Sequence, residues 1–161
     1  MFIEGIRHCF KQAYMHLIGP SNSALEFLRA EVDFALDNDL SNDQFAKVYL
    51  ESDDDAFFVV IMNGQVIGTR GIHIIGRECK FVRLSILPAS KRRGIAELLC
   101  QQTELFAKSH HCTMMFLIVW GANVVSLKFH QAMGFDVKKT EQTCGEVYMT
   151  MKKRVTHKRR K

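Results

Sequence analysis

The sequence predicts an α+β (α/β) fold in which a mixed, mostly antiparallel sheet is flanked by helices. Three features support this prediction. Asn63-Gly64 joins two apolar runs, as the tight turn of a β-hairpin does. A helical pattern connects apolar runs near residues 80–87 and 114–120, which is the crossover that a parallel strand pair requires. Capping-box patterns at Ser23 and Ser41 place helices before the sheet.

The elements before the sheet are helical by pattern. Apolar residues recur at a helical period through residues 2–17. Ser23 with Glu26 and Ser41 with Gln44 then precede apolar residues at helical spacing, as capping boxes do. Two further helices are therefore expected.

The strands follow from residue 57 onward. Phe57–Met62 and Val66–Ile74 form the hairpin, in which Gly68 and Gly71 permit close approach or a bulge. The next strand is expected over Lys80–Leu87. Its alternation places apolar and polar side chains on opposite faces: Val82, Leu84 and Ile86 against Arg83 and Ser85.

The second half of the chain completes the sheet. A helix from Ile95 to about Lys108 leads to the wholly apolar strand Met114–Trp120. A helix from Asn123 follows, and the strands Phe135–Lys139 and Glu146–Met151 close the sheet as a hairpin.

Composition indicates one globular domain. The chain has 161 residues and 47% hydrophobic content. No uninterrupted apolar stretch reaches the roughly 18 residues that span a bilayer, and Glu4, Arg7 and Lys11 interrupt any signal-peptide core. The five cysteines include no C-x-x-C pair, so neither a disulfide framework nor a zinc site is predicted. We expect a cytoplasmic protein without a membrane segment or a bound metal.

The positive charge is concentrated at the C-terminal end. The net charge is +5, but residues 152–161 hold seven of the 22 basic residues and no acidic ones. The rest of the chain is mildly acidic. We therefore expect one domain over residues 1–151 and a basic, flexible tail over residues 152–161, which is either solvated or attracted to an anionic surface such as nucleic acid.

Residues 88–99 place a basic loop with a glycine between a strand and a helix. The first N–H groups of a helix lack intrahelical partners and lie at the positive end of its dipole, so a pyrophosphate binds there readily. Gly94 lets the backbone come close to such a ligand, and Lys91, Arg92 and Arg93 add charged donors. The alternative is a solvated basic turn.

A second segment, residues 123–135, has the pattern of an amphipathic helix closed by a glycine. Together the two segments resemble the GNAT superfamily of acetyl-CoA-dependent N-acetyltransferases. The first is similar to its acyl-CoA loop, Q/R-x-x-G-x-G/A, with Lys91, Gly94 and Ala96 in the defining places. The second is similar to the family's N-x-x-A-x-x-x-Y-x-x-x-G-F helix, matched by Asn123, Ser126, His130, Gly134 and Phe135.

The resemblance implies a GNAT-type sheet whose parallel strand pair splays apart and holds the pantetheine arm of acetyl-CoA in the opening. It also implies an opening strand over Gln12–Ile18, in place of the helical period there, and both interpretations stay open. Asn123 would contact CoA or fix the strand end, and Phe129 would lie beside the cofactor or in the core. The implied cofactor-binding residues are Ile86, Leu87, Lys91, Arg92, Arg93, Gly94, Ile95, Ala96, Asn123 and Phe129.

The implied chemistry is direct attack of a neutral amine on the thioester in a ternary complex. Lys91 replaces the usual glutamine or arginine and keeps a donor. His130 stands where the family commonly has the tyrosine that protonates the CoA thiolate, so it is either that acid or a helix-surface histidine. Glu78 and Ser85 are candidates for relaying the amine proton, and a strand N–H near Leu87 is the expected donor to the carbonyl oxygen.

The acceptor is suggested only by charge. Residues 31–55 contain nine acidic residues and one basic residue, Lys47. Such a field would attract a cationic amine, for example a polyamine, an aminoglycoside, or a protein lysine or N-terminus. The alternative is that these carboxylates serve solubility.

Two other functions and the oligomeric state remain open. One is a protein that binds acyl-CoA with little or no transferase activity, which the replacement of the tyrosine by His130 suggests. The other is a small nucleic-acid-binding domain that uses the basic loop and the tail, although interleaved aromatic residues are absent from both. A dimer is compatible with the sequence.

Overall fold

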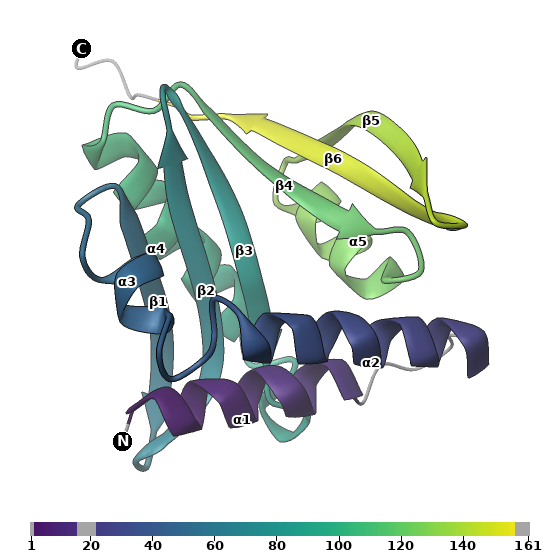
Figure 1. Cartoon of the computed structure of the whole chain (residues 1–161). Coiled ribbons are helices and arrows are strands. Elements are labelled where there is room, and N and C mark those ends of the chain that lie inside the picture. Colours follow the sequence, from purple (N-terminus) through teal and green to yellow (C-terminus); the bar gives the residue numbers. More distant parts are fainter. Residues whose placement is uncertain (1, 16–21, 157–161) are drawn as a thin grey trace.

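Six strands form one mixed sheet (Figure 1). The computed structural model describes residues 2–15 and 22–156, and within them the strand order is β1-β2-β3-β4-β6-β5. Neighbouring strands are antiparallel except β3 and β4, which are parallel, so the predicted fold class is confirmed. The strands are β1 (Asp55–Met62), β2 (Gln65–Ile75), β3 (Glu78–Ile86), β4 (Met114–Trp120), β5 (Asp136–Thr143) and β6 (Glu146–Arg154).

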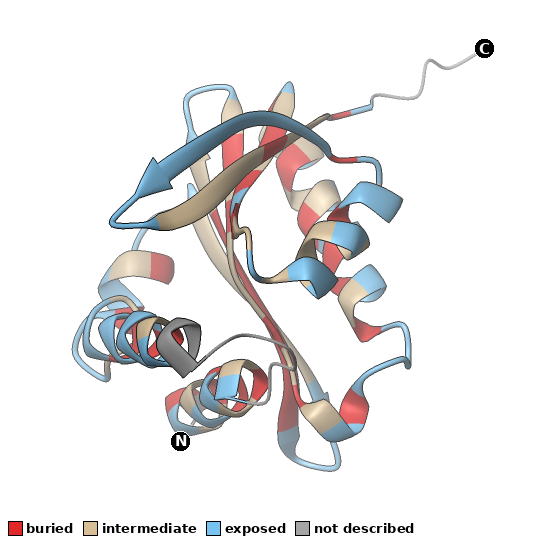
Figure 2. Ribbon diagram, turned by 90° about the vertical axis from the view of Figure 1, so that its right-hand side faces the viewer, coloured by how far each residue is buried: buried red, intermediate tan, exposed pale blue. Residues whose placement is uncertain are grey.

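Helices cover both faces of the sheet, as Figure 2 shows in a view turned by 90°. On one face, Ile6 of the first helix and Val32 of the second belong to a buried cluster that Val82 borders. On the other face, Cys100 and Ala107 lie in a separate cluster. No helix within the described ranges is long and apolar enough to cross a membrane. The helices are α1 (Phe2–Met15), α2 (Asn22–Asp37), α3 (Phe45–Tyr49), η1 (Pro88–Ser90), α4 (Ile95–Ser109) and α5 (Val124–Ala132).

The N-terminal segment is a helix. α1 buries Ile3, Ile6 and Phe10, which recur at the helical period seen in the sequence. The alternative of a strand over Gln12–Ile18 is therefore wrong for residues 12–15, and residues 16–18 lie outside the described residues.

Only one of the two predicted capping boxes can be compared with the structure. The Ser23 pattern falls on side chains outside the described residues, although α2 does begin there. Before α3, the N–H of Gln44 donates to the hydroxyl of Ser41 at 3.1 Å, so this half of the predicted capping box is present.

The hairpin of β1 and β2 turns at Asn63-Gly64. Both residues have positive φ, 51° and 77°, as a two-residue type I′ turn requires, and the predicted hairpin is confirmed. The strand glycines lie where neighbours come close. An added Cβ would lie 2.8 Å from Ile95 at Gly68 and 2.9 Å from Tyr49 at Gly71.

β3 contains a bulge at Arg83, which corrects the predicted faces of this strand. Arg83 has φ 56°, and the register with β2 shifts opposite it. An added Cβ on Gly71 would meet Val82 and a side chain of α3, whereas one on Gly68 would meet Ile86 and side chains of α4. Val82 and Ile86 thus face opposite sides of the sheet. The prediction of one common apolar face is wrong because the bulge adds a residue between them.

β3 and β4 pair only where they begin. Residues 78–80 pair with residues 114–116, and within the described residues no later position of β3 pairs with β4. The two strands then diverge toward their C-terminal ends (Figure 1). This is the splayed parallel pair that the family resemblance implies, and it leaves one edge of β3 open.

β6 extends further than predicted. Lys152, Lys153 and Arg154, which we expected in a flexible tail, pair with residues 114–116 of β4. Val155 is buried, and its N–H donates to the carbonyl of Thr113. The predicted boundary at residue 152 is therefore wrong, because the backbone of these basic residues continues the pairing of β6 with β4. Residues 157–161 lie outside the described residues.

Candidate active site

A cavity of about 460 Å³, here called the loop cavity, opens between the basic loop, β3 and α5. It brings together the two segments that carry the family resemblance, although they are distant in sequence. Arg93 and Leu87 are not among its lining residues. The predicted cofactor residues that do line it are Ile86, Lys91, Arg92, Gly94, Ile95, Ala96, Asn123 and Phe129.

The loop presents backbone donors to this cavity. Gly94 has φ 75° and Arg92 has φ 65°, which turn the chain sharply before α4. The first hydrogen bond of α4 runs from the N–H of Leu98 to the carbonyl of Gly94 at 3.0 Å. The N–H groups of residues 95–97 therefore have no acceptor within the helix, and these residues line the cavity together with Lys91. An anion placed here would meet donors, positive side chains and the positive end of a helix dipole.

The open edge of β3 offers a donor at Ile86 and not at Leu87. The N–H of Leu87 donates to the carbonyl of Ile67 in β2 at 2.9 Å, so it is already used. Hydrogen bonds alternate in direction along an antiparallel strand, so the N–H of Ile86 points to the other edge, where β4 has separated. Of the two strand N–H groups at this position, that of Ile86 is therefore the one directed at the open edge.

Asn123 and Phe129 come from α5. The side chain of Asn123 caps this helix by accepting the N–H of Ser126 at 3.2 Å, and Gly134, with φ 96°, ends it. Phe129 lines the loop cavity and also packs against the core. Each residue therefore has a structural role beside its place in the cavity wall.

A second cavity of about 340 Å³, here called the aromatic cavity, lies between α1, α2, β3 and β4. The rings of Phe27 and Trp120 are 5.7 Å apart, and the Trp120 Nε1–H donates to Glu146 Oε2 at 2.8 Å. Of the nine acidic residues in the segment 31–55, only Glu31 is among its lining residues. The aromatic residues in its wall are Phe10, Tyr14, Phe27, Phe81, Trp120 and Tyr148.

The two cavities share three lining residues, Tyr14, Asn123 and Ser126. The Tyr14 hydroxyl donates to the carbonyl of Leu84 at 3.0 Å, at the diverging end of β3. Two ligands bound in the two cavities would therefore meet beside these residues.

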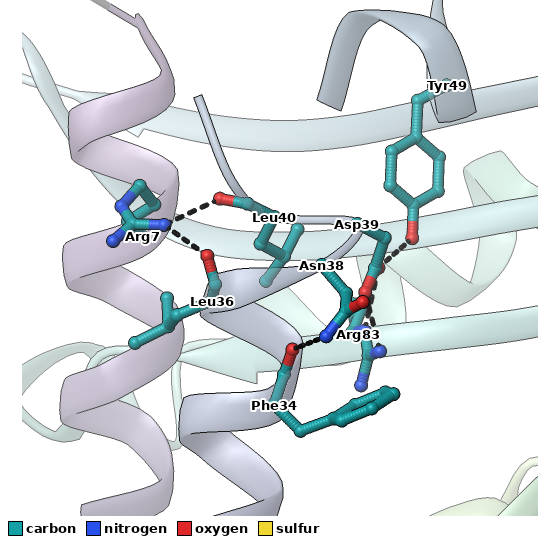
Figure 3. A network of polar contacts seen from close by, with 8 residues as sticks. All are labelled: Arg7, Phe34, Leu36, Asn38, Asp39, Leu40, Tyr49 and Arg83. Atoms are coloured by element: carbon teal, nitrogen blue, oxygen red, sulfur yellow. Dashed lines mark hydrogen bonds and ion pairs between the residues drawn. The ribbon is translucent and has the colours of Figure 1, made fainter. Parts of the chain in front are cut away.

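A network of polar contacts holds the bulge of β3 in place (Figure 3). Arg83 donates to both carboxylate oxygens of Asp39, at 2.9 and 2.7 Å, and the Tyr49 hydroxyl donates to Asp39 at 2.6 Å. Burial alone would raise the pKa of Asp39, but these hydrogen bonds and the Arg83 charge hold it below its usual value. Asp39 therefore neutralises Arg83 and contributes to structure, not to a field that attracts substrates.

The chain is similar to known proteins. The model of the acetyltransferase (GNAT) family matches residues 22–135. The chain belongs to this family. The predicted family is confirmed.

Individual relatives match over part of their sequences. The chain is 35% identical over 81 residues to the uncharacterized protein YdhI of Bacillus subtilis, covering 50% of this chain and 49% of that one. It is 36% identical over 67 residues to an aminoglycoside N(6')-acetyltransferase type 1 of Acinetobacter haemolyticus, covering 42% and 43%. The chain thus spans somewhat less than half the length of these relatives.

Solved GNAT structures match over nearly the whole chain. One is a probable acetyltransferase of Staphylococcus epidermidis, with a TM-score of 0.75, 10% identity and coverage of 95% of this chain and 93% of that one. Another is the PaiA N-acetyltransferase of Thermoplasma acidophilum in complex with coenzyme A, with a TM-score of 0.70, 20% identity and coverage of 92% and 89%. At such identities the likeness shows the fold.

His130 does not occupy the position of an acid. It is 2% exposed, and it lines neither cavity. Its Nδ1 lies 2.8 Å from the carbonyl of Ser126, so this nitrogen carries the ring proton, and its Nε2 accepts from Arg70 Nη2 at 3.0 Å. Burial, together with the Arg70 charge, lowers the pKa of His130 to about 4. His130 is therefore a neutral residue of the core. Both expectations for it, the acid and the helix-surface histidine, are wrong.

Glu78 lies at the wrong end of β3 to relay a proton. It pairs with Met114 where β3 and β4 are joined, and its Oε1 accepts from Lys152 Nζ at 3.1 Å. Ile86 lies eight positions further along β3, a distance of about 26 Å in an extended strand. Glu78 lines neither cavity.

Ser85 lines the loop cavity, but its hydroxyl is already engaged. It is 2% exposed and contacts the hydroxyl of Thr69 and, at 3.5 Å, the Sγ of Cys9. Thr69 donates its proton to the carbonyl of Arg83 at 2.9 Å, so Ser85 is the donor to Thr69. Ser85 therefore joins β3 to α1 and β2, and a proton-relay role does not fit this arrangement.

The sequence did not indicate three features of the site. These are Tyr14, the place of Ser126 in the wall of both cavities, and the rings of Phe27, Trp120 and Tyr148. Tyr14 is part of a helical repeat and carries no motif. Trp120 is the last residue of an apolar strand, and only the divergence of β3 and β4 opens a cavity beside it. Ser126 was a motif position, so it was the one residue with a signal in the sequence.

Proposed function

We propose that this GNAT protein transfers the acetyl group of acetyl-CoA to an amine by direct attack in a ternary complex. The observation that carries the proposal is the pair of cavities that meet at Tyr14, Asn123 and Ser126, beside the diverging ends of β3 and β4. One cavity suits the cofactor and the other the amine. Their meeting point suits a reaction between the two.

Acetyl-CoA fits the loop cavity by its chemistry. Its diphosphate would accept hydrogen bonds from the N–H groups of residues 95–97 and lie beside Lys91 and Arg92. Its pantetheine arm would run along the open edge of β3, as an added strand does. The Ile86 N–H at that edge would then donate to the thioester carbonyl oxygen as negative charge develops there.

The acceptor would enter through the aromatic cavity. The aromatic rings in its wall and the carboxylate of Glu31 favour a cationic group. Lys80 and Arg83 also line this cavity, but Lys80 lies where β3 and β4 are joined, and the charge of Arg83 is paired with Asp39. We therefore expect an amine with a second positive charge, whose reacting nitrogen is uncharged when it reaches the thioester.

Calorimetry and a panel of amines test the proposal. Wild-type protein should bind acetyl-CoA, and release of free CoA should depend on one class of amine among spermidine, an aminoglycoside such as kanamycin, and a lysine-containing peptide. Binding without CoA release from any amine would favour the acyl-CoA-binding alternative. No heat with acetyl-CoA would refute the whole proposal.

Replacement of Glu31 with glutamine should weaken binding of the acceptor amine and leave binding of acetyl-CoA unchanged. The loss of one exposed ion pair, worth roughly 0.5–1 kcal/mol, should raise the KM of a dicationic amine about two- to fivefold, with kcat unchanged. Asp33→Asn is the matched control, because Asp33 is exposed on the same helix and lines neither cavity. Equal KM values in the two variants would show that Glu31 does not contact the amine.

A further inference from the structure

With His130 buried and neutral, the acid for the leaving thiolate must come from elsewhere. The groups with a transferable proton in the shared wall of the two cavities are the hydroxyls of Tyr14 and Ser126 and the amide of Asn123. An amide is not an acid at neutral pH, and an aliphatic alcohol is a far weaker acid than a phenol. The phenol of Tyr14 remains.

We propose that Tyr14 is the catalytic acid that protonates the thiolate of CoA as it leaves. The inference rests on the acetyl transfer proposed above. It assigns the reaction a residue from α1, at the opposite end of the sequence from the family motif in α5.

The position of Tyr14 fits this role. It lies in the last turn of α1, half-buried, with its ring centroid 4.7 Å from that of Phe10. Its hydroxyl reaches the carbonyl of Leu84, one residue beyond the bulge of β3. A thioester lying along the open edge of β3 would therefore pass directly beside this hydroxyl, which can turn from the carbonyl to a sulfur atom.

The surroundings of Tyr14 suit a proton donor. Burial raises the pKa of the phenol, so it keeps its proton at neutral pH. The positive charges of Arg83 and Arg70 act in the opposite sense and favour the phenolate that remains after proton transfer. Arg83 is itself held by Asp39 at 2.7 Å, so this charge stays fixed near Tyr14 during the reaction.

The proposed step balances. The amine nitrogen forms a bond to the thioester carbon, and the carbon–sulfur bond breaks with its electron pair on sulfur. The Tyr14 proton passes to sulfur, so CoA leaves as a thiol. The nitrogen releases its own proton to water, and a proton from water restores the phenol.

The test measures the acidity of the thiol in bound CoA and needs no acceptor. Thiolate absorbance is followed against pH for the CoA complexes of wild-type and Tyr14→Phe protein, both with Cys144→Ser. Cys144 is the exposed cysteine, whereas burial raises the pKa of the other four thiols. If Tyr14 donates to sulfur, its loss should raise the pKa of the bound thiol by about one unit, a tenfold change in the acid dissociation constant.

A matched control separates catalysis from structure. Tyr49→Phe also removes a hydroxyl with one hydrogen bond, to Asp39, but Tyr49 lines neither cavity. It should leave the thiol pKa unchanged. With an active amine, Tyr14→Phe should lower kcat about a hundredfold or more at an unchanged KM for acetyl-CoA.

Three outcomes decide the matter. A raised thiol pKa in Tyr14→Phe alone supports the inference. The same thiol pKa in wild type and Tyr14→Phe, with CoA bound to both, overturns the role of Tyr14 and leaves the proposed transfer standing. Failure of wild-type protein to bind CoA overturns both.

Discussion

Replacement of Gly94 with aspartate is expected to weaken acetyl-CoA binding by about thirtyfold or more. Gly94 lines the loop cavity, and an added Cβ there would lie more than 4 Å from every described residue other than its two chain neighbours. Its φ of 75° lies in the left-handed region, which aspartate tolerates better than most residues. Each of two diphosphate charges about 4 Å from the new carboxylate costs about 1 kcal/mol in water and more near a protein surface. The dissociation constant, measured by isothermal titration, should rise accordingly.

Gly94→Asn separates charge from crowding. Asparagine has nearly the same shape as aspartate and adopts the same backbone conformation, but it brings no charge. The asparagine variant should therefore bind acetyl-CoA more tightly than the aspartate variant, and the difference should shrink at high salt because salt screens the repulsion. Equal binding by the two variants at low salt would place the diphosphate away from the loop.

The parts of the site that were predictable from sequence are those built by local backbone structure. The loop before α4 needs a glycine at a positive φ, and the first N–H groups of any helix are unpaired. Residues 91, 92 and 94–96 could therefore be assigned to the loop cavity from the sequence, whereas Arg93, also predicted, does not line it. The capping side chain of Asn123 and the closing Gly134 similarly define α5. Each of these features depends on residues within one turn or loop.

The parts that were missed depend on contacts between distant segments. The bulge at Arg83 is held by Asp39, which lies in the loop after α2. The sequence of β3 alone does not predict it. Without the bulge, alternation places Val82 on the wrong face. Tyr14 likewise lines both cavities only because α1 crosses the sheet where β3 and β4 diverge.

The substitution at His130 shows the same limit. The family motif in α5 suggests a catalytic role for the residue at this position. The protonation of His130, however, depends on its neighbour Arg70 in β2. Arg70 is 1% exposed, and its Nε and Nη1 have no hydrogen-bond partner among the described residues. Its guanidinium lies 4.5 Å from the centroid of the Phe81 ring. A buried arginine therefore uses His130 as an acceptor, which turns the histidine into a structural residue.

Acidification is accordingly expected to destabilise the fold through His130. Its folded-state pKa of about 4 lies below the usual value of 6.5, so the unfolded chain binds the proton more tightly. The stability that this group contributes is fully present above pH 6.5 and is lost as the pH falls toward 4. The loss amounts to about 2 kcal/mol at pH 5 and about 3 kcal/mol in total.

Urea unfolding at pH 7.5 and pH 5 of the wild type and of His130→Gln measures this contribution. Glutamine can still offer an acceptor to Arg70 but does not titrate, so its free energy of unfolding should depend less on pH, by the same 2 kcal/mol or so. At pH 7.5 the variant should be the less stable protein, because the ring packs at 5.0 Å from Phe129 and 5.6 Å from Phe135. An identical pH dependence in the two proteins would mean that His130 titrates normally in the fold. That result would contradict the assignment of His130 as a neutral residue of the core.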